Sequence, residues 1–246
     1  MKQHEAVIQT MERLGGIATL GQLYQETLKV KECEWKTTTP FASIRRIVQT
    51  RPNEIYKIKP GLYGLVSHRA LNEANGILAE TPHNKNSKKL KESNHYYYQG
   101  LLLTIGNLRR FQTFAPNQDK NRQFLNITLG ELRTLEKVPP FSYDYFINKI
   151  STVDVVWFNK RKMPDSLFEV ESTTDIIKSL SKFCDLQDFN VRMLIVADKV
   201  RKPEFESKIA GKSFESIKNR VQFLDYNSLV KQYEHEIERA QFETIV

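Results

Sequence analysis

Three carboxylates near two expected strands are the residues of this sequence best placed to do chemistry. Asp154 lies in the apolar run 153–158, and Glu169 and Glu171 lie in the run 167–172. Because strand side chains alternate between faces, the glutamates point the same way, and strand pairing would bring Asp154 beside Glu169. Such acids are costly unless a cation neutralises them. Magnesium prefers carboxylates and substrate phosphate, so the pattern favours metal-assisted phosphoryl transfer. The alternative is purely structural: Glu169 and Glu171 would form a solvated strand face, and Asp154 would be a paired acid in the core.

An α/β fold is expected, with a mixed sheet flanked by helices as the scaffold for these acids. β-branched and aromatic residues fill 153–158, and the polar segment 159–165 connects that strand to 167–172 as a hairpin. The apolar run 191–197 predicts a buried strand parallel to its neighbours. Hydrophobic spacing predicts, in addition, a helix from His95 to Leu108, a strand over 111–116, a helix capped by Ser172, Thr173 and Thr174 and running to Leu186, a helix through Phe205 and Ile209, a strand over 221–224, and a helix from Ser228 to Gln241.

The first part of the chain predicts an α+β module of the winged helix-turn-helix type. Three short helices are expected over 5–14, 20–28 and 40–48, followed by a hairpin over 54–65. A threonine before Pro40 is a typical helix start. In this architecture the third helix enters the major groove of DNA and the wing touches its backbone. The expected DNA contacts are Thr37, Thr38, Thr39, Ser43, Arg45, Arg46, Lys57 and Lys59. A winged helix used for protein contacts, with its arginines solvated, is the alternative.

Charge is divided unevenly along the chain. The formal net charge is +8; residues 1–94 hold 15 Lys+Arg against 9 acids, and residues 95–246 hold 22 against 20. That balance favours a polyanionic partner and two modules with different tasks. We expect a winged-helix domain over 1–66, a basic polar linker over 67–94 and a catalytic domain over 95–246.

Cysteine usage and the N-terminal residues indicate the compartment. Cys33 and Cys184 are too few and too far apart for a disulfide framework or a cysteine-based zinc site. The first residues lack the apolar core of a signal peptide, and the sequence holds no run of about 18 apolar residues. We therefore expect a cytoplasmic protein without a membrane span.

Two stretches of the N-terminal part resemble a known family. The segments 39–46 and 55–65 are similar to the HARE-HTH winged-helix family. Members of that family are fused to restriction endonucleases and also occur in chromatin and polymerase-associated proteins. The resemblance covers about residues 1–66 and implies DNA binding, not catalysis.

The order of elements after residue 94 resembles the PD-(D/E)XK restriction-endonuclease fold. Asp154 matches the motif aspartate and Glu169 the second acid, and the resemblance implies that the Val170 carbonyl is a further metal ligand. It also implies Mg²⁺ as the cofactor, with Mn²⁺ as a substitute. The segments 153–157 and 168–173 look like those of a bacterial and archaeal group of type II restriction enzymes with a glutamate at the third motif position.

Glu171 stands where this superfamily usually has a lysine. A glutamate can act as a base or hold metal, but it cannot directly stabilise an anionic phosphorane. Gln99 is a further catalytic candidate, because the resemblance implies a metal-side acid or amide at its place on the first helix, and Asp119, in the loop after the first strand, is another; each has a purely structural alternative. A positive group could come from one of four lysines that are otherwise solvated: Lys160, Lys162, Lys178 and Lys182. Three histidines show no ligand spacing and are expected to be incidental: His83, His95 and His235.

These observations predict a metal-dependent DNA endonuclease of restriction type that hydrolyses phosphodiester bonds of duplex DNA. Because one centre cuts one strand, we expect a homodimer on a symmetric site, with a cognate DNA methyltransferase as a further partner. The alternative is a catalytically inactive nuclease-fold regulator that binds DNA, which Glu171 in place of lysine favours. A third interpretation joins an RNA- or protein-binding winged helix to an unrelated α/β enzyme, although no glycine-rich phosphate loop or serine-elbow motif supports another chemistry.

Overall fold

The computed structural model describes residues 1–84, 87–172 and 175–243. The chain forms two compact units. Unit 1 comprises Met1–Ser93 and Val230–Val246, and unit 2 comprises Asn94–Leu229. Both ends of the chain therefore contribute to unit 1, whereas unit 2 is one continuous segment. The domain borders expected at residues 66 and 95 stay predictions.

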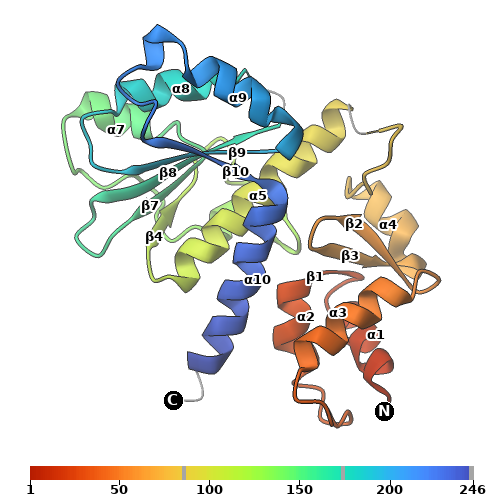
Figure 1. Ribbon diagram of the computed structural model, residues 1–246. Coiled ribbons are helices and arrows are strands. Elements are labelled where there is room, and N and C mark those ends of the chain that lie inside the picture. The colour runs from red at the N-terminus through yellow and green to blue at the C-terminus, as the bar shows by residue number, and fades with distance from the viewer. Residues whose placement is uncertain (85–86, 173–174, 244–246) are drawn as a thin grey trace. The chain divides into compact units, whose positions relative to one another are not determined.

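Unit 1 is a small module of helices and a three-stranded sheet (Figure 1). Its sheet is antiparallel, with the strand order β1-β3-β2. Thr19 caps the helix that follows β1, because its hydroxyl accepts the N–H of Gln22 at 3.1 Å. Gly61, with φ of 72°, makes the turn between β2 and β3. The elements in chain order are α1 (Gln3–Arg13), β1 (Ile17–Thr19), α2 (Leu20–Thr27), α3 (Pro40–Thr50), β2 (Ile55–Lys59) and β3 (Leu62–Leu65).

Helical structure occupies part of the segment that the sequence predicts to be a linker. A 3₁₀ turn (Val66–His68) leads into α4 (Arg69–Ala74), and α5 spans Lys88–Leu108. The helix expected to start at His95 therefore begins earlier, at Lys88. Its first turns bury Leu90 in unit 1, an apolar side chain in an otherwise polar stretch, which is why composition alone predicts no helix there.

The C-terminal helix α10 (Tyr226–Glu243) completes unit 1 from Val230 onward. Tyr233 is buried there, and its hydroxyl shares a hydrogen bond of 3.0 Å with the hydroxyl of Thr19. A Cβ on Gly21 would lie 2.7 Å from the Tyr233 ring, so only glycine lets α2 and α10 approach this closely.

Unit 2 is built on a five-stranded mixed sheet with the order β10-β9-β8-β7-β4. β4, β7 and β8 pair antiparallel, and β8, β9 and β10 pair parallel, so the predicted hairpin and the predicted parallel strand are both confirmed. The strands are β4 (Gln112–Phe114), β7 (Val155–Phe158), β8 (Pro164–Glu171), β9 (Arg192–Ala197) and β10 (Val221–Asp225).

Helices cover both faces of this sheet (Figure 1). On one face, α7 (Asp144–Ile150), α8 (Ile176–Asp185) and α9 (Lys202–Ile209) share a core with inward-facing strand residues such as Leu167 and Ile195. On the other face lies α5, whose Leu102 carbonyl accepts the indole N–H of Trp157 at 3.1 Å. The side chains of β8 are thereby divided between an α8 face and an α5 face.

One predicted helix cap is corrected by the structure. The N-cap of α8 is Asp175, whose carboxylate accepts the N–H of Ile177 at 3.0 Å. Of the predicted capping residues, Thr173 and Thr174 lie outside the described residues. Among the described helices, none combines the length and the apolarity that a membrane crossing requires.

Candidate metal centre

The backbone of Val170, in β8, holds two side chains at one end of the sheet. Its N–H donates to Oδ2 of Asp154 at 2.7 Å, and its carbonyl accepts from Nδ1 of His95 at 2.8 Å. Asp154 directly precedes β7, and His95 lies on α5. Because a carbonyl oxygen only accepts, Nδ1 carries the proton, and the neutral ring presents a lone pair at Nε2.

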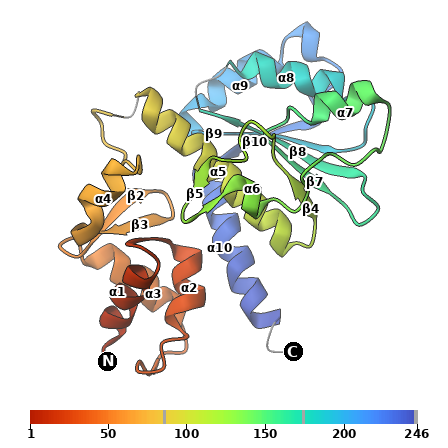
Figure 2. The ribbon, with the colours of Figure 1, turned by 180° about the vertical axis from the view of Figure 1, so that it is seen from behind.

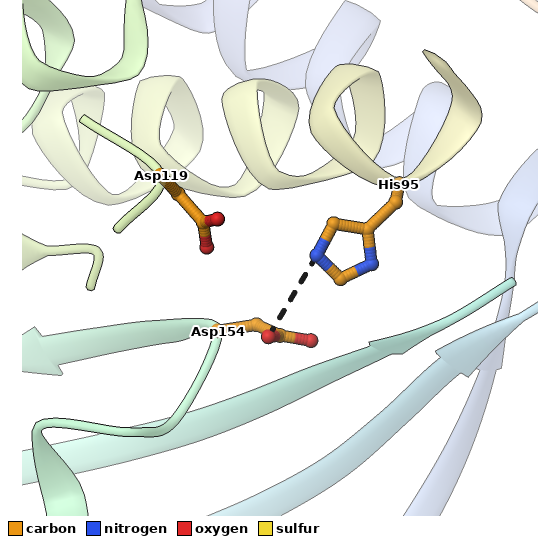
Figure 3. Close-up of side chains that lie close together, drawn as sticks. All are labelled: His95, Asp119 and Asp154. Carbon is orange, nitrogen blue, oxygen red and sulfur yellow. Dashed lines mark ion pairs between the residues drawn. The ribbon is translucent and has the colours of Figure 1, made fainter. Parts of the chain in front are cut away.

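His95, Asp119 and Asp154 form a cluster whose chemistry suits a cation (Figure 3). Each offers one ligand atom, and these three atoms lie within 4.8 Å of one another. Nε2 of His95 is 3.7 Å from Oδ1 of Asp154. Figure 3 shows the imidazole on its helix and the Asp119 carboxylate on its loop, both directed toward Asp154 at the strand end. One imidazole and two carboxylates are ligands that divalent metal ions accept.

Gln99 lies one helical turn after His95 and donates hydrogen bonds to two residues of the cluster. Its side chain is fully buried, and its Nε2 donates to Oδ2 of Asp119 at 3.2 Å and to the carbonyl of Asp154 at 3.0 Å. Its Oε1 is buried without a hydrogen-bond partner among the described residues. An orphaned buried oxygen beside two carboxylates is a local excess of acceptors, which a cation would relieve.

Close backbone approaches position the loop that carries Asp119. The N–H of Gly130, in α6 (Leu129–Leu132), donates to the carbonyl of Lys120 at 2.8 Å, and a Cβ on Gly130 would lie 2.8 Å from that same oxygen. Phe124, in β5 (Gln123–Phe124), packs on Gly100 of α5, where a Cβ would come within 2.1 Å of the ring. β5 pairs with β6 (Ile127–Thr128), and Figure 2 shows this hairpin and α6 beside α5.

Glu169 points to the other face of β8 and meets α8. Nζ of Lys182 donates to both of its carboxylate oxygens at 2.9 Å, and Oγ of Ser179 donates to its Oε2 at 3.0 Å. Lys182 also donates to the carbonyl of Thr152 at 2.8 Å. Of the lysines considered from the sequence, Lys182 is therefore the one that the structure brings to a motif acid.

Glu171 is buried two residues further along the same face. Its Oε1 accepts a hydrogen bond from Ser179, and its Oε2 lies 3.7 Å from Nη1 of Arg201. That oxygen has no hydrogen-bond partner among the described residues. The Glu171 carbonyl accepts from Arg201 at 3.1 Å.

Burial shifts the pKa values of the central groups toward their neutral forms. It raises the pKa of Asp154 to about 7, although the charge of Lys182 and the Val170 N–H oppose the rise. Burial, and after it the charge of Asp154, raises the pKa of Glu169 to about 8. Burial also lowers the pKa of His95. A bound cation would favour the ionised carboxylates and the neutral imidazole, so these residues fit a metal ion.

The structure leaves some of the predicted DNA-contact residues on the surface. Thr38, Thr39, Arg46 and Lys57 are exposed on or near α3 and the β2–β3 hairpin, and Thr37 and Ser43 are half-buried. Thr39 occupies the N-cap of α3, but its side chain makes no capping hydrogen bond.

Two other predicted DNA contacts are engaged within unit 1. Arg45 donates to Glu234 of α10 at 2.9 Å and to the hydroxyl of Tyr24 at 3.1 Å. Lys59 is only 3 % exposed, and its ammonium donates to Oγ of Ser93 at 3.2 Å. A DNA-contact role for Lys59 does not fit this burial.

His95 is the site residue that sequence reasoning missed. It was expected to be incidental because no partner stands near it in the sequence, whereas Asp154 and Val170 reach it from far along the chain. A signal was present: His95 and Gln99 are four positions apart on a predicted helix, which places both on one face. The structure brings the predicted candidates Asp119 and Gln99 to the same place.

The chain matches a known protein family. A sequence model of a protein family described as "Type II restriction enzyme NmeDI C-terminal domain" matches residues 77–245, more than half of the chain. The matched range includes His95, Asp119, Asp154 and Glu169. Neither a curated protein nor a solved structure matches the chain.

Proposed function

The chain belongs to the family of the type II restriction enzyme NmeDI C-terminal domain, and from that premise we propose that unit 2 is a metal-dependent DNA endonuclease centred on Asp154. The proposed reaction is hydrolysis of phosphodiester bonds in duplex DNA. The observation that carries it is the convergence of His95, Asp119 and Asp154 in one cluster on a chain of this family. The resemblance to the PD-(D/E)XK fold adds that Asp154, Glu169 and the Val170 carbonyl hold Mg²⁺ or Mn²⁺.

A divalent cation, when bound, supplies the positive charge that activates water and stabilises negative charge developing on the scissile phosphate. The residues of the chain do the positioning. The Val170 N–H and the Gln99 amide fix the carboxylates of Asp154 and Asp119 in place, so little reorganisation is needed when the substrate arrives. Lys182 supplies the positive group that the motif lacks at Glu171.

We further propose that unit 1 is a winged helix that holds duplex DNA. The order of three short helices and a hairpin supports this, as do the basic residues of α3 and the wing, Arg46 and Lys57, which are exposed. The HARE-HTH resemblance, a homodimer and a methyltransferase partner belong to the same proposal.

Plasmid nicking by the full-length protein tests the nuclease. Wild type incubated with plasmid and phage DNA of differing methylation should cut in Mg²⁺ or Mn²⁺ and stop in EDTA. Asp154→Asn should lower cleavage by at least about 10³-fold while leaving electrophoretic DNA binding intact. Asp165→Asn is the matched control, because Asp165 lies on β8 but pairs with Arg192.

Cleavage by Asp154→Asn at the wild-type rate would refute this assignment. Tight DNA binding by wild type without any metal-dependent cleavage would instead favour the alternative of an inactive DNA-binding regulator.

A further inference from the structure

We propose that His95, Asp119 and Asp154 form a nitrogen-containing cation site that binds Mn²⁺ and related transition-metal ions more tightly than Mg²⁺. The inference rests on the proposed function only in that it shares Asp154 with the catalytic centre. It adds a ligand, His95, and a metal preference that the carboxylate motif does not supply.

Hydrogen bonds from neighbouring groups orient all three side chains, as is usual for residues that ligate a metal. A metal-binding histidine commonly donates its other ring N–H to a backbone carbonyl, and Nδ1 of His95 does this to Val170. Val170 also donates its N–H to Oδ2 of Asp154, while Gln99 donates to Oδ2 of Asp119. Each residue is thereby held by one atom and presents another toward the cluster centre.

The spacing of the cluster suits a shared ion. Two ligand atoms that are each roughly 2.1 Å from one metal lie about 3–4 Å apart, depending on the angle between them. Nε2 of His95 and Oδ1 of Asp154 are 3.7 Å apart, and the third ligand atom lies within 4.8 Å of both. A shift of roughly 1 Å in the Asp119 loop would bring its ligand atom into this range.

This site differs from the ligand set that the carboxylate motif implies. Glu169 lies on the opposite face of β8, where Lys182 and Ser179 engage both of its oxygens. The Val170 carbonyl accepts the proton of His95 with one lone pair and keeps the other for the metal of the carboxylate motif. The ligand atoms of His95 and Asp119 therefore lie on the side of Asp154 that faces α5.

The imidazole decides which ions the site prefers. Mg²⁺ favours all-oxygen coordination and gives up its water reluctantly, whereas imidazole nitrogen suits Mn²⁺ better, and Co²⁺, Ni²⁺ and Zn²⁺ better still. We expect Mn²⁺ to bind at least about 10-fold more tightly than Mg²⁺, and His95→Gln to remove most of that difference.

Mn²⁺ titration and pulsed electron paramagnetic resonance of the full-length protein, without DNA, test the site. Wild type should show ¹⁴N coupling from a directly bound nitrogen. His95→Gln should lose the coupling and weaken Mn²⁺ binding at least about 10-fold, and Asp119→Asn should also weaken binding. His83→Gln, at an exposed histidine of unit 1, is the control and should behave as wild type. Circular dichroism verifies that each variant is folded.

Two results would exclude this site: Mn²⁺ bound to wild type without a coordinated nitrogen, and a nitrogen signal that survives in His95→Gln. Either result could coexist with Mg²⁺-dependent cleavage, which would preserve the nuclease. Nitrogen-coordinated Mn²⁺ in a protein that cuts no DNA would instead refute the nuclease and preserve the site.

Discussion

Lys182 brings positive charge to the acidic centre from a helix instead of from the strand that carries the motif. In a lysine-containing motif the cation would project from position 171 of β8, but Glu171 is there and is engaged by Ser179. The ammonium of Lys182 instead reaches Glu169 from α8. Burial is the largest single influence on the pKa of Lys182 and lowers it, but the charge and hydrogen bond of Glu169, together with the charges of Asp154 and Glu171, outweigh burial and raise the pKa, so the group stays positive.

Lys182→Met should lower the single-turnover cleavage rate by about 10²-fold or more, because a positive group beside the reacting phosphate is lost. It should also destabilise the protein by about 1–3 kcal/mol, because the carboxylate of Glu169 stays buried but loses its partner. The loss is moderate because Lys182 is partly exposed. Lys178→Met, at an exposed position of the same helix, is the control. Single-turnover cleavage and denaturant unfolding measure the two effects, and equal rates in both variants would contradict the role.

Arg45 and Arg46 are adjacent in the sequence but differ in their surroundings. Both are exposed, but Arg45 is paired with Glu234. Arg46→Ala should weaken duplex binding roughly 3- to 10-fold, because one phosphate contact is lost. The slope of log K against the logarithm of the salt concentration should become shallower by about one. Arg45→Ala should leave that slope unchanged. Fluorescence anisotropy over a range of NaCl concentrations measures both, and identical slopes for wild type and Arg46→Ala would refute the predicted contact.

Asp154 and Glu169 could be singled out from the sequence because their signal is local, and their catalytic roles stay a prediction. Asp154 and Glu169 stand at fixed places in apolar strand patterns, and alternation alone assigns their faces. His95 could not be predicted in this way, because its role comes from contacts with Val170 and Asp154 that only tertiary structure creates. Which lysine serves the site was open for the same reason.

A β-bulge in β2 decides the environment of Lys59. The pairing with β3 shifts between Lys57 and Lys59, so Ile58 and Lys59 are both buried, whereas regular alternation would place both lysines on one face. Burial lowers the pKa of Lys59 to about 7. The sequence alone gives no sign of the residue that the bulge inserts into β2, so it predicts that Lys59 lies on the surface.

Lys59 should make the stability of the protein depend on pH. The folded state holds this lysine with a pKa of about 7, below its ordinary value of 10.5. Between these values the unfolded chain binds more protons, so the free energy of unfolding should rise as the pH increases from about 7 toward 10. Lys59→Met should remove this contribution and stabilise the protein at pH 7 by several kcal/mol, on the order of the pKa shift.

Denaturant unfolding of wild type and Lys59→Met at several pH values checks this. The stability difference between the two proteins should be largest at and below about pH 7 and shrink toward pH 10. A difference that does not change with pH would show that Lys59 is not buried as described.

Most elements of the fold follow from periodicity, and the exceptions have physical causes. The strands and helices of both units were predicted wherever an apolar stripe or alternation runs through them. The β5–β6 hairpin was not predicted, because each of its strands is only two residues long and carries no period. Its place depends on Phe124 packing against Gly100, a contact between distant parts of the sequence.

At the scale of the whole molecule, unit 1 is assembled from both ends of the chain. Tyr233 of α10 fills the space that Gly21 leaves and is bonded to Thr19. The sequence predicts the terminal helix but not the unit it joins, because amphipathic spacing identifies an apolar face without naming what covers it.

Tyr233→Ala should destabilise unit 1 by about 3–5 kcal/mol, the usual loss for a buried aromatic side chain. Hydrogen exchange should therefore quicken over α2 and β1 while the β7–β8 pair stays protected. Tyr143→Ala, at a side chain that is 81 % exposed, is the control. Unchanged exchange in α2 would show that α10 does not support this unit.

The ribosome makes residues 230–243 after every strand of the central sheet, although they belong with the first residues of the chain. A nascent protein therefore carries its N-terminal module unfinished, with Thr19 and Gly21 facing water, until α10 has been made. Any premature stop within unit 2 leaves a product that can never finish that module.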